Sequence, residues 1–268
     1  MPEGNETHRW ALLHAELFAG KRVQIDSPQG RFAREAGLVD GRVLKAVLAV
    51  GKHLGYDFGT VGGERRIIHV HMGLYGDFVE GKQPMPKPRG ALRMRLWTNS
   101  DWLELRGPTD CSVWKEAQWQ KLLARLGPDP LNKDKPDRMI ERITTRRAPV
   151  GTLLMDQAVV SGVGNIYRAE VLFRAGISPF RAGCALSEQE ARALWKDISV
   201  LMPHGMMDRR IVTTRPRHRS QLRGEVQDED AHYVYRRTGQ PCRICGMKIE
   251  TQVMAGRNLF WCPVCQAV

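Results

Sequence analysis

Two stretches decide the fold of the C-terminal part of this chain: PCRICG at Pro241–Gly246 and FWCPVC at Phe260–Cys265. They place two CxxC pairs sixteen residues apart, formed by Cys242, Cys245, Cys262 and Cys265. Each pair lets two thiolates approach one ion from a tight turn, and the insert is long enough for a β-hairpin that brings the second pair back to the first. The spacing predicts one structural zinc ion (Zn2+).

Two disulfides are the alternative use of these cysteines, but nothing else in the sequence is typical of a secreted protein. The insert has a tip at Ala255–Asn258 that carries Arg257. We expect the metal-bound hairpin to present this arginine to an anion. The remaining cysteines, Cys111 and Cys184, are expected to be small buried apolar residues.

The chain carries a strong positive charge. Its 268 residues include 41 Lys+Arg against 29 Asp+Glu, which gives a formal charge of +12 and a pI near 9.7. A field of this sign favours a polyanionic partner, with nucleic acid first and a membrane surface second. Because no apolar run reaches signal-peptide or membrane-spanning length, we expect a cytoplasmic protein with no membrane partner.

The first half of the chain has the pattern of a β-sandwich that follows an N-terminal helix. Apolar residues at helical spacing predict the helix over Glu3–Phe18, and Gly81–Gly90 is expected to be a surface loop. Leu92, Met94 and Leu96 alternate with Arg93, Arg95 and Trp97, as in a strand with one buried face. The expected strands are Arg22–Asp26, Val43–Val50, His53–Phe58, Arg66–Val70, Leu92–Trp97 and Trp102–Arg106.

The second half has the pattern of a helical domain. Pro and charged residues at 128–136 predict a linker, and Ser187 with Glu190 forms a capping box at the start of an amphipathic helix. Between Asp208 and Gly224 the chain carries six arginines and no acid after Asp208, which indicates a basic loop or a merely solvated segment. The arginines are Arg209, Arg210, Arg215, Arg217, Arg219 and Arg223.

A glycine-punctuated stretch, Met155–Arg168, lies in the middle of this half. Gly162 and Gly164 predict a turn, and a new helix is expected to open near Asn165. The first turn of such a helix directs backbone N–H groups and the Asn165 amide outward, which suits a phosphate. A turn that only connects two packed helices is the alternative.

Three segments together resemble one family. LMDQ…SGVGNIYRAEVLFRAGISP (154–179) is similar to the helix-two-turn-helix segment of the formamidopyrimidine-DNA glycosylase and endonuclease VIII family of base-excision enzymes. The cysteine finger with Arg257 resembles that family's zinc finger, and Met1-Pro2-Glu3-Gly4 resembles its N-terminus. The three matches follow the family's order and span nearly the whole chain.

The resemblance implies a chemical role for the N-terminus. After removal of Met1, Pro2 is a secondary α-amine with a pKa of roughly 7.7 to 8.0, so a neutral fraction exists near pH 7. Its attack on C1′ of a damaged nucleotide expels the base and leaves an iminium (Schiff base), which favours strand scission by β,δ-elimination. Glu3 is the expected general acid or proton relay, and Glu6 is similar to the family's supporting acid.

The same resemblance implies the DNA contacts. Lys52, Asn165 and Arg257 match positions that hold phosphates around a flipped nucleotide, and Lys52 and Arg257 are counted with the catalytic set. Leu74 and Tyr75 match the wedge loop that fills the hole left in the duplex, with ordinary core packing as the alternative. His69 and His71 lie on one strand face, and we expect hydrogen-bonded packing rather than a second metal site, because no carboxylate or third ligand is placed with them in the sequence.

Departures from the family pattern favour one branch. The stretch Gly107–Trp114 lacks the arginine and phenylalanine that accompany the wedge in formamidopyrimidine-DNA glycosylases, so reading of the opposite base should be weak. The Pro2-Glu3-Gly4 start and the Leu74-Tyr75 wedge look more like the bacterial endonuclease VIII branch. That branch implies oxidised pyrimidines as substrates, and fewer wedge residues suggest activity on single-stranded or bubble DNA as well.

The expected fold is α+β, with four parts. These are an N-terminal helix plus antiparallel β-sandwich catalytic domain (1–127), a linker (128–136), a helix-two-turn-helix DNA-binding domain (137–230) and a C-terminal zinc finger (231–268). The expected protein is a monomeric, nucleoid-associated glycosylase and AP lyase of base excision repair. A catalytically silent protein that binds DNA or abasic sites, and an RNA- or ribosome-binding zinc-ribbon protein, are the alternatives.

Overall fold

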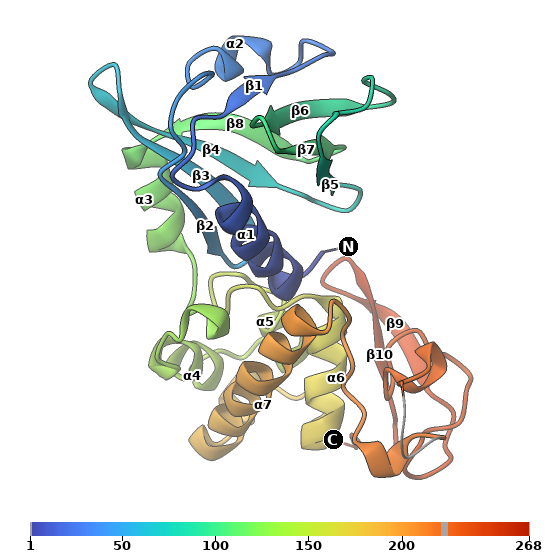
Figure 1. Cartoon of the computed structure of the whole chain (residues 1–268). Helices are drawn as coiled ribbons and strands as arrows, with labels where there is room; N and C mark the ends of the chain where they lie inside the picture. Colours follow the sequence, from blue (N-terminus) through green and yellow to red (C-terminus); the bar gives the residue numbers. More distant parts are fainter. Residues whose placement is uncertain (1, 221–224, 268) are drawn as a thin grey trace. The chain divides into compact units, whose positions relative to one another are not determined.

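The structure, a computed structural model, describes residues 2–220 and 225–267 (Figure 1). The chain divides into two compact units, one ending at Arg125 and one starting at Leu126. This division falls shortly before the expected linker at 128–136. None of the described helices is both long and apolar enough to cross a membrane.

The first unit combines one long helix with two antiparallel sheets. One sheet has the strand order β1-β6-β7-β5 and the other has the order β2-β3-β4-β8 (Figure 1). The strands are β1 (Gln24–Asp26), β2 (Ala46–Val50), β3 (His53–Val61), β4 (Glu64–His71), β5 (Asp77–Lys82), β6 (Leu92–Trp97), β7 (Asp101–Arg106) and β8 (Asp110–Lys115). The helices are α1 (Gly4–Phe18), α2 (Ala33–Ala36) and α3 (Glu116–Arg125).

A single core joins the two sheets and α1. Trp10 and Phe18 of α1 are buried in the same cluster as Tyr56 of β3 and Leu103 of β7. Burial of large aromatic and aliphatic side chains of this kind contributes roughly 1.5–3 kcal/mol each. The expected α+β sandwich is therefore confirmed, and the packing fixes the N-terminal helix on it.

Two strands of the sandwich are missing from the sequence prediction. β5 and β8 each lie at the edge of their sheet, and both carry charged residues. Edge strands have one unpaired side, so they lack the continuous apolar alternation that identifies a strand in a sequence. The expected loop at Gly81–Gly90 is correspondingly too long at its start, since β5 extends to Lys82.

Two burial predictions are wrong. In β6 the expected polar position Arg95 is buried, because it lies 3.1 Å from the buried Glu104 carboxylate of β7. Cys184 is exposed, whereas Cys111 is buried as expected. The buried Arg95 cation is tolerated because the Glu104 carboxylate is fixed beside it.

The second unit is helical and ends in a β-hairpin finger. Its helices are α4 (Asp137–Thr144), α5 (Val150–Leu153), α6 (Asn165–Ala175) and α7 (Glu188–Met207), with 3₁₀ turns η1 (Pro130–Asn132), η2 (Gly183–Ala185), η3 (Pro216–His218) and η4 (Asp228–Asp230). The finger consists of β9 (Glu250–Met254) and β10 (Arg257–Trp261). The predicted capping box is confirmed, because Ser187 and Glu190 cap α7 reciprocally.

Helix α6 is the centre of this unit, because it contributes to two cores. Tyr167 and Leu172 pack into the cluster shared with α4, α5 and α7. Ala169 and Phe173 pack into a second cluster with the finger, which includes Phe260. A helix that is buried on both sides has little freedom to rotate, so residues at its start are held rigidly.

A buried carboxylate ties α6 to the start of the finger. The Glu170 side chain is 0% exposed and accepts hydrogen bonds of 2.8 Å from the backbone N–H groups of Tyr233, Val234 and Tyr235. It also accepts a hydrogen bond from the Thr213 hydroxyl. Glu170 thus fixes both ends of the segment 213–235. Most of the expected basic loop at 208–224 lies in or next to this segment, although its Arg223 is outside the described residues.

We expect Glu170→Gln to destabilise the second unit by about 3 kcal/mol, because an amide NH₂ would face backbone donors that need an acceptor. Urea unfolding followed by the fluorescence of the buried finger aromatics measures the loss. Glu188→Gln at the exposed start of α7 is the matched control. An equal unfolding midpoint for Glu170→Gln and Glu188→Gln would show that the Glu170 contacts contribute little.

Candidate active site and metal centre

The N-terminus lies at the head of α1. Pro2 is partly exposed and precedes the helix, and Glu3 is the N-cap residue, 2% exposed. The Glu3 carbonyl accepts hydrogen bonds from Glu6 N–H (3.1 Å) and Thr7 N–H (3.2 Å). These contacts fix the backbone that carries Pro2. The positive end of the helix also favours a carboxylate at this point.

Glu6 is held by its own helix. Its carboxylate accepts a hydrogen bond from Arg9 Nε at 2.9 Å. The hydrogen bond to Glu6 raises the pKa of Arg9. The structure therefore groups Pro2, Glu3 and Glu6 at one helix start and places the Glu6 carboxylate beside the Arg9 guanidinium.

Three turns of the sandwich leave the sheet at the same end. His53 at the start of β3 pairs with His71 at the end of β4, and His71 pairs with Asp110 at the start of β8. This register places three turns at the same end of the strands. They are Gly51–Lys52, the turn 72–76 that carries the wedge candidates (the wedge turn) and the turn 107–109. A Cβ on Gly73 would lie 1.8 Å from Thr109 Oγ1, so the last two turns are in direct contact.

The wedge candidates are exposed. Leu74 is 46% exposed and Tyr75 is 85% exposed, so the core-packing alternative for this pair is wrong. Gly73 and Gly107, at φ +65° and +54°, hold the two touching turns in a left-handed backbone that side chains rarely adopt. Two apolar side chains are thus presented on a braced turn, and an insertion role stays a prediction.

A histidine chain beside Lys52 could not be found from the sequence. Asp110 Oδ2 lies 2.6 Å from His69 Nδ1, and His69 Nε2 lies 2.9 Å from His53 Nδ1. The His69 ring also stacks on Trp114 with the centroids 3.7 Å apart. Hydrogen-bonded packing of His69 is therefore correct, but the expectation that no carboxylate or third group accompanies it is wrong.

The hydrogen-bonded row from Asp110 through His69 ends at His53, the residue after Lys52, and bears on its protonation state. The Asp110 carboxylate accepts the hydrogen of His69 Nδ1, which leaves His69 Nε2 facing His53 Nδ1. Burial, followed by the neighbouring His69 and His71, lowers the pKa of His53 to about 3, which keeps its ring neutral near pH 7. Lys52 itself is partly exposed at the turn.

In the second unit, the glycine turn leads directly into α6. Gly162 has φ +86°, and its N–H donates to the Gln157 side chain at 3.0 Å. The same side chain donates to the Val163 carbonyl at 2.9 Å. Gly164 is the N-cap residue and Asn165 is the first residue of the helix. The Gln157 side chain therefore braces this turn.

Asn165 is joined to the finger hairpin. It is 8% exposed, and its amide nitrogen donates to the Asn258 carbonyl at 2.9 Å. Its amide oxygen accepts a hydrogen bond from the fully buried Arg168, whose guanidinium also donates to the Met254 carbonyl at 3.1 Å. Because a guanidinium only donates, it fixes the orientation of the Asn165 amide. Arg168 was not assigned a role from the sequence.

Arg257 follows a tight two-residue turn. Ala255 and Gly256 have φ +52° and +68°, the pattern of a type I′ hairpin turn that matches the twist of its strands. Arg257 opens β10 and pairs with Met254, and its side chain is only partly exposed. The hairpin therefore carries this arginine at its tip, a short distance from the backbone that Asn165 and Arg168 hold.

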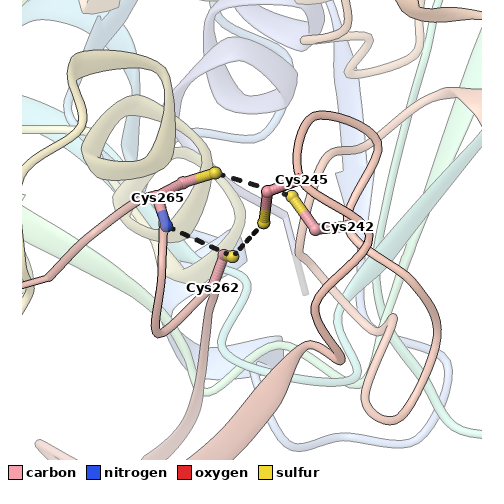
Figure 2. Close-up of side chains that lie close together, drawn as sticks. All are labelled: Cys242, Cys245, Cys262 and Cys265. Carbon is pink, nitrogen blue, oxygen red and sulfur yellow. Dashed lines mark hydrogen bonds between the residues drawn. The ribbon is translucent and has the colours of Figure 1, made fainter.

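The four cysteines form a closed metal centre (Figure 2). The Sγ atoms of Cys242, Cys245, Cys262 and Cys265 all lie within 4.8 Å of one another, with separations of 3.9 Å for Cys242–Cys265 and 3.4 Å for Cys245–Cys262. A tetrahedral zinc with Zn–S near ~2.3 Å needs sulfurs roughly 3.8 Å apart. Within residues 2–220 and 225–267 this is the one cluster of three or more potential ligands.

The knuckles also suit thiolates. Backbone N–H groups of Ile244 and Cys265 donate to Cys242 Sγ and Cys262 Sγ, each at 3.4 Å. A backbone N–H at Met247 lowers the pKa of Cys245 to about 7, whereas burial raises the pKa values of Cys262 and Cys265. N–H donors and a lowered pKa favour the charged ligand form. The expected single structural zinc fits this donor set, and it fills a site without an open position for chemistry.

Comparison with known proteins assigns the class. Residues 126–215 match the formamidopyrimidine-DNA glycosylase H2TH domain, and residues 239–268 match the zinc finger found in FPG and IleRS. The chain belongs to the formamidopyrimidine-DNA glycosylase and endonuclease VIII family, whose members are DNA glycosylases with AP lyase activity.

Relatives in both branches match the full length. "Endonuclease 8 1" of Mycobacterium tuberculosis is 47% identical over 99% of this chain and 100% of the relative. The formamidopyrimidine-DNA glycosylase of Thermus thermophilus is 33% identical over 97% of this chain and 96% of the relative. A Lactococcus lactis FPG mutant bound to a Fapy-dG containing DNA has the same fold, with a TM-score of 0.80 at 21% identity over 100% of both chains.

Proposed function

We propose that this chain is a bifunctional DNA glycosylase and AP lyase of base excision repair whose nucleophile is Pro2. The observation that carries the proposal is the Pro2-Glu3 start at the head of α1 in a chain that matches the family over its whole length. Met1 must be removed first, because an acylated Pro2 nitrogen has no lone pair for attack. Met1 lies outside the described residues.

The chemistry follows from the secondary amine. Pro2 N attacks C1′, the C1′–N bond to the base breaks, and the ring-opened sugar remains as an iminium on Pro2. Loss of a C2′ proton expels the 3′ phosphate, and a second elimination expels the 5′ phosphate. Glu3, adjacent to the nucleophile and held as the helix N-cap, protonates the sugar ring oxygen or relays these protons, and Glu6 supports it.

The phosphates are held by groups from both units. Lys52 on the turn before β3, Asn165 at the start of α6 and Arg257 at the hairpin tip each bind a backbone phosphate beside the flipped nucleotide. The hydrogen bond from Asn165 to the Asn258 carbonyl supports a shared role, because it joins Asn165 to the residue after Arg257. Leu74 and Tyr75 fill the gap in the duplex, which their exposure permits.

Because its proposed substrate is damaged DNA, we propose that the protein acts in the cytoplasm at the nucleoid. We also propose that it acts as a monomer. Its formal charge of +12 supports the electrostatic part of DNA binding. A catalytically silent DNA-binding protein is the second candidate, because Lys52, Asn165 and Arg257 would bind DNA equally well without the chemistry.

Borohydride reduction on DNA that contains an abasic site tests the nucleophile. We expect a covalent adduct with the processed protein and at least a hundredfold loss of trapping in Pro2→Gly, because borohydride traps the iminium that forms on the Pro2 secondary amine and glycine lacks that secondary amine. Pro28→Gly, at an exposed loop proline, is the matched control and should trap normally. Protein of intact mass lacking Met1 that fails to trap would favour the silent binder.

Arg257→Ala tests the finger. We expect zinc content and the unfolding midpoint to stay unchanged, while affinity for DNA with a tetrahydrofuran abasic analogue falls about tenfold, since one phosphate contact is lost. Competition binding at two salt concentrations should also show a smaller salt dependence. The exposed Lys248→Ala in the same finger is the control. Normal binding by Arg257→Ala would leave the hairpin tip a purely structural role.

For substrates, we propose oxidised pyrimidines, with little dependence on the opposite base. The support is the turn 107–109, which contacts the wedge turn but carries neither arginine nor phenylalanine. We expect cleavage of thymine glycol in single-stranded or bubble DNA to be within about tenfold of the duplex rate. Strong duplex preference together with clear opposite-base bias, measured by single-turnover cleavage, would contradict this proposal.

A further inference from the structure

A hollow of about 340 Å³ lies at the C-terminal end of α6, beside the zinc centre. Its lining combines Phe173 and Gly176 of the helix end with Tyr233, Ile244 and Cys265. This volume is within the range of small ligand pockets. The eleven residues of α6 separate it by about 15 Å from the Gly162–Asn165 turn, so it is not part of the proposed phosphate grip.

The walls of the hollow are apolar and aromatic. The rings of Phe173 and Tyr233 stack with centroids 4.8 Å apart. Ile244, between two zinc ligands, is 52% exposed, and Met247 and Val264 on the two knuckles are 46% and 51% exposed. Ile244 lines the hollow, and exposed apolar side chains on metal-bound turns are typical of a protein-binding surface.

One buried polar group belongs to this lining. The Tyr233 hydroxyl accepts a hydrogen bond from Arg215 N–H at 2.9 Å and lies 2.8 Å from His218 Nδ1. His218 Nε2 accepts from Arg217 Nε at 3.1 Å, so a neutral His218 carries its hydrogen on Nδ1 and donates to the same hydroxyl. Among the described residues, both contacts thus supply hydrogens to Tyr233, and the hydroxyl hydrogen is available to an acceptor.

The rim of the hollow is positively charged. Arg215 lines the hollow, and Arg217 is next to it because its Nε donates to the lining residue His218. Both arginine side chains are exposed, and within the described part of the chain neither forms an ion pair. Arg174, by contrast, is neutralised by Asp197 at 2.6 Å. An apolar floor, a hydroxyl donor and two uncompensated guanidinium groups are complementary to an acidic chain that carries an apolar side chain.

We propose that this hollow, the α6–knuckle pocket, is a docking site for an acidic peptide segment of a partner protein with an aromatic or aliphatic anchor residue. The anchor packs between Phe173 and Ile244, and flanking carboxylates face Arg215 and Arg217. Nucleic acid is less suited, because its phosphates gain nothing from the apolar walls. The site lies at the opposite end of α6 from Asn165, so peptide and DNA engage different groups.

Fluorescence anisotropy on the full zinc-loaded chain, without DNA, tests the proposal. The probe is a labelled peptide Asp-Glu-Asp-Phe-Asp-Glu with an amidated C-terminus, compared with the same peptide carrying Ser for Phe and with a Lys-Lys-Lys-Phe-Lys-Lys peptide. We expect the acidic Phe peptide to bind at least tenfold more tightly than the other two. Ile244→Asp and Arg215→Glu should each weaken it at least tenfold, because one removes apolar contact and both repel the acids.

The matched controls are Val200→Asp and Lys196→Glu, exposed positions on α7, which should bind the peptide like the wild type. Arg215→Glu should also keep its zinc and its abasic-site cleavage, which separates this pocket from the proposed glycosylase function. Equal binding of the acidic and basic peptides, or unchanged binding by Ile244→Asp and Arg215→Glu, would overturn the proposal. A nucleic-acid site would be identified instead if a short oligothymidylate displaced the peptide from the wild type and did not bind to Ile244→Asp.

Discussion

The second unit depends on the polar side chains of one buried helix. Arg168 and Glu170 of α6 are both fully buried, and each uses its charge on backbone groups of the finger region. Glu170 binds three consecutive N–H groups where the finger segment begins, and Arg168 binds a carbonyl of the hairpin near its tip. Buried charges are costly unless they are fully hydrogen-bonded, so these contacts allow little variation in position. The finger is consequently an extension of α6 rather than an appended module.

The zinc has a structural part in this arrangement. With four sulfur ligands the metal has no open position, so it contributes rigidity to the knuckles from which the hairpin projects. The type I′ turn then places Arg257 at the tip. The metal, the hairpin turn and Arg168 together restrict the position of Arg257. A guanidinium held in a defined position can bind a phosphate with defined geometry.

Local patterns carried the sequence prediction, and long-range contacts limited it. The cysteine spacing, the capping box at Ser187 and the glycine turn before Asn165 are encoded within a few residues, and the structure has all three. The edge strands β5 and β8 were missed because the signal of a strand weakens where only one side is paired. The chain from Asp110 through His69 to His53 spans three strands, so only the register of the sheet brings it together.

The candidate site shows the same difference between local patterns, which the sequence predicts, and long-range contacts, which it does not. Exposure of Leu74 and Tyr75 settles against core packing, which their residue types alone could not do. The burial of Arg168 was unpredictable, because an arginine in a helix is usually solvated and two of its acceptors lie on β9 and α5. The roles of Pro2, Glu3 and Lys52 were predicted from the family resemblance, because no local pattern around them indicates a chemical role.

A double-mutant cycle on binding of tetrahydrofuran DNA tests most directly whether α6 positions Arg257 through Arg168. If it does, Arg168→Met and Arg257→Ala each weaken binding about tenfold, and the double variant is close to either single one, since the second change removes a contact already lost. Zinc content of all three variants confirms that the finger is retained. Losses that multiply to about a hundredfold would contradict the account, because the two arginines would then act independently.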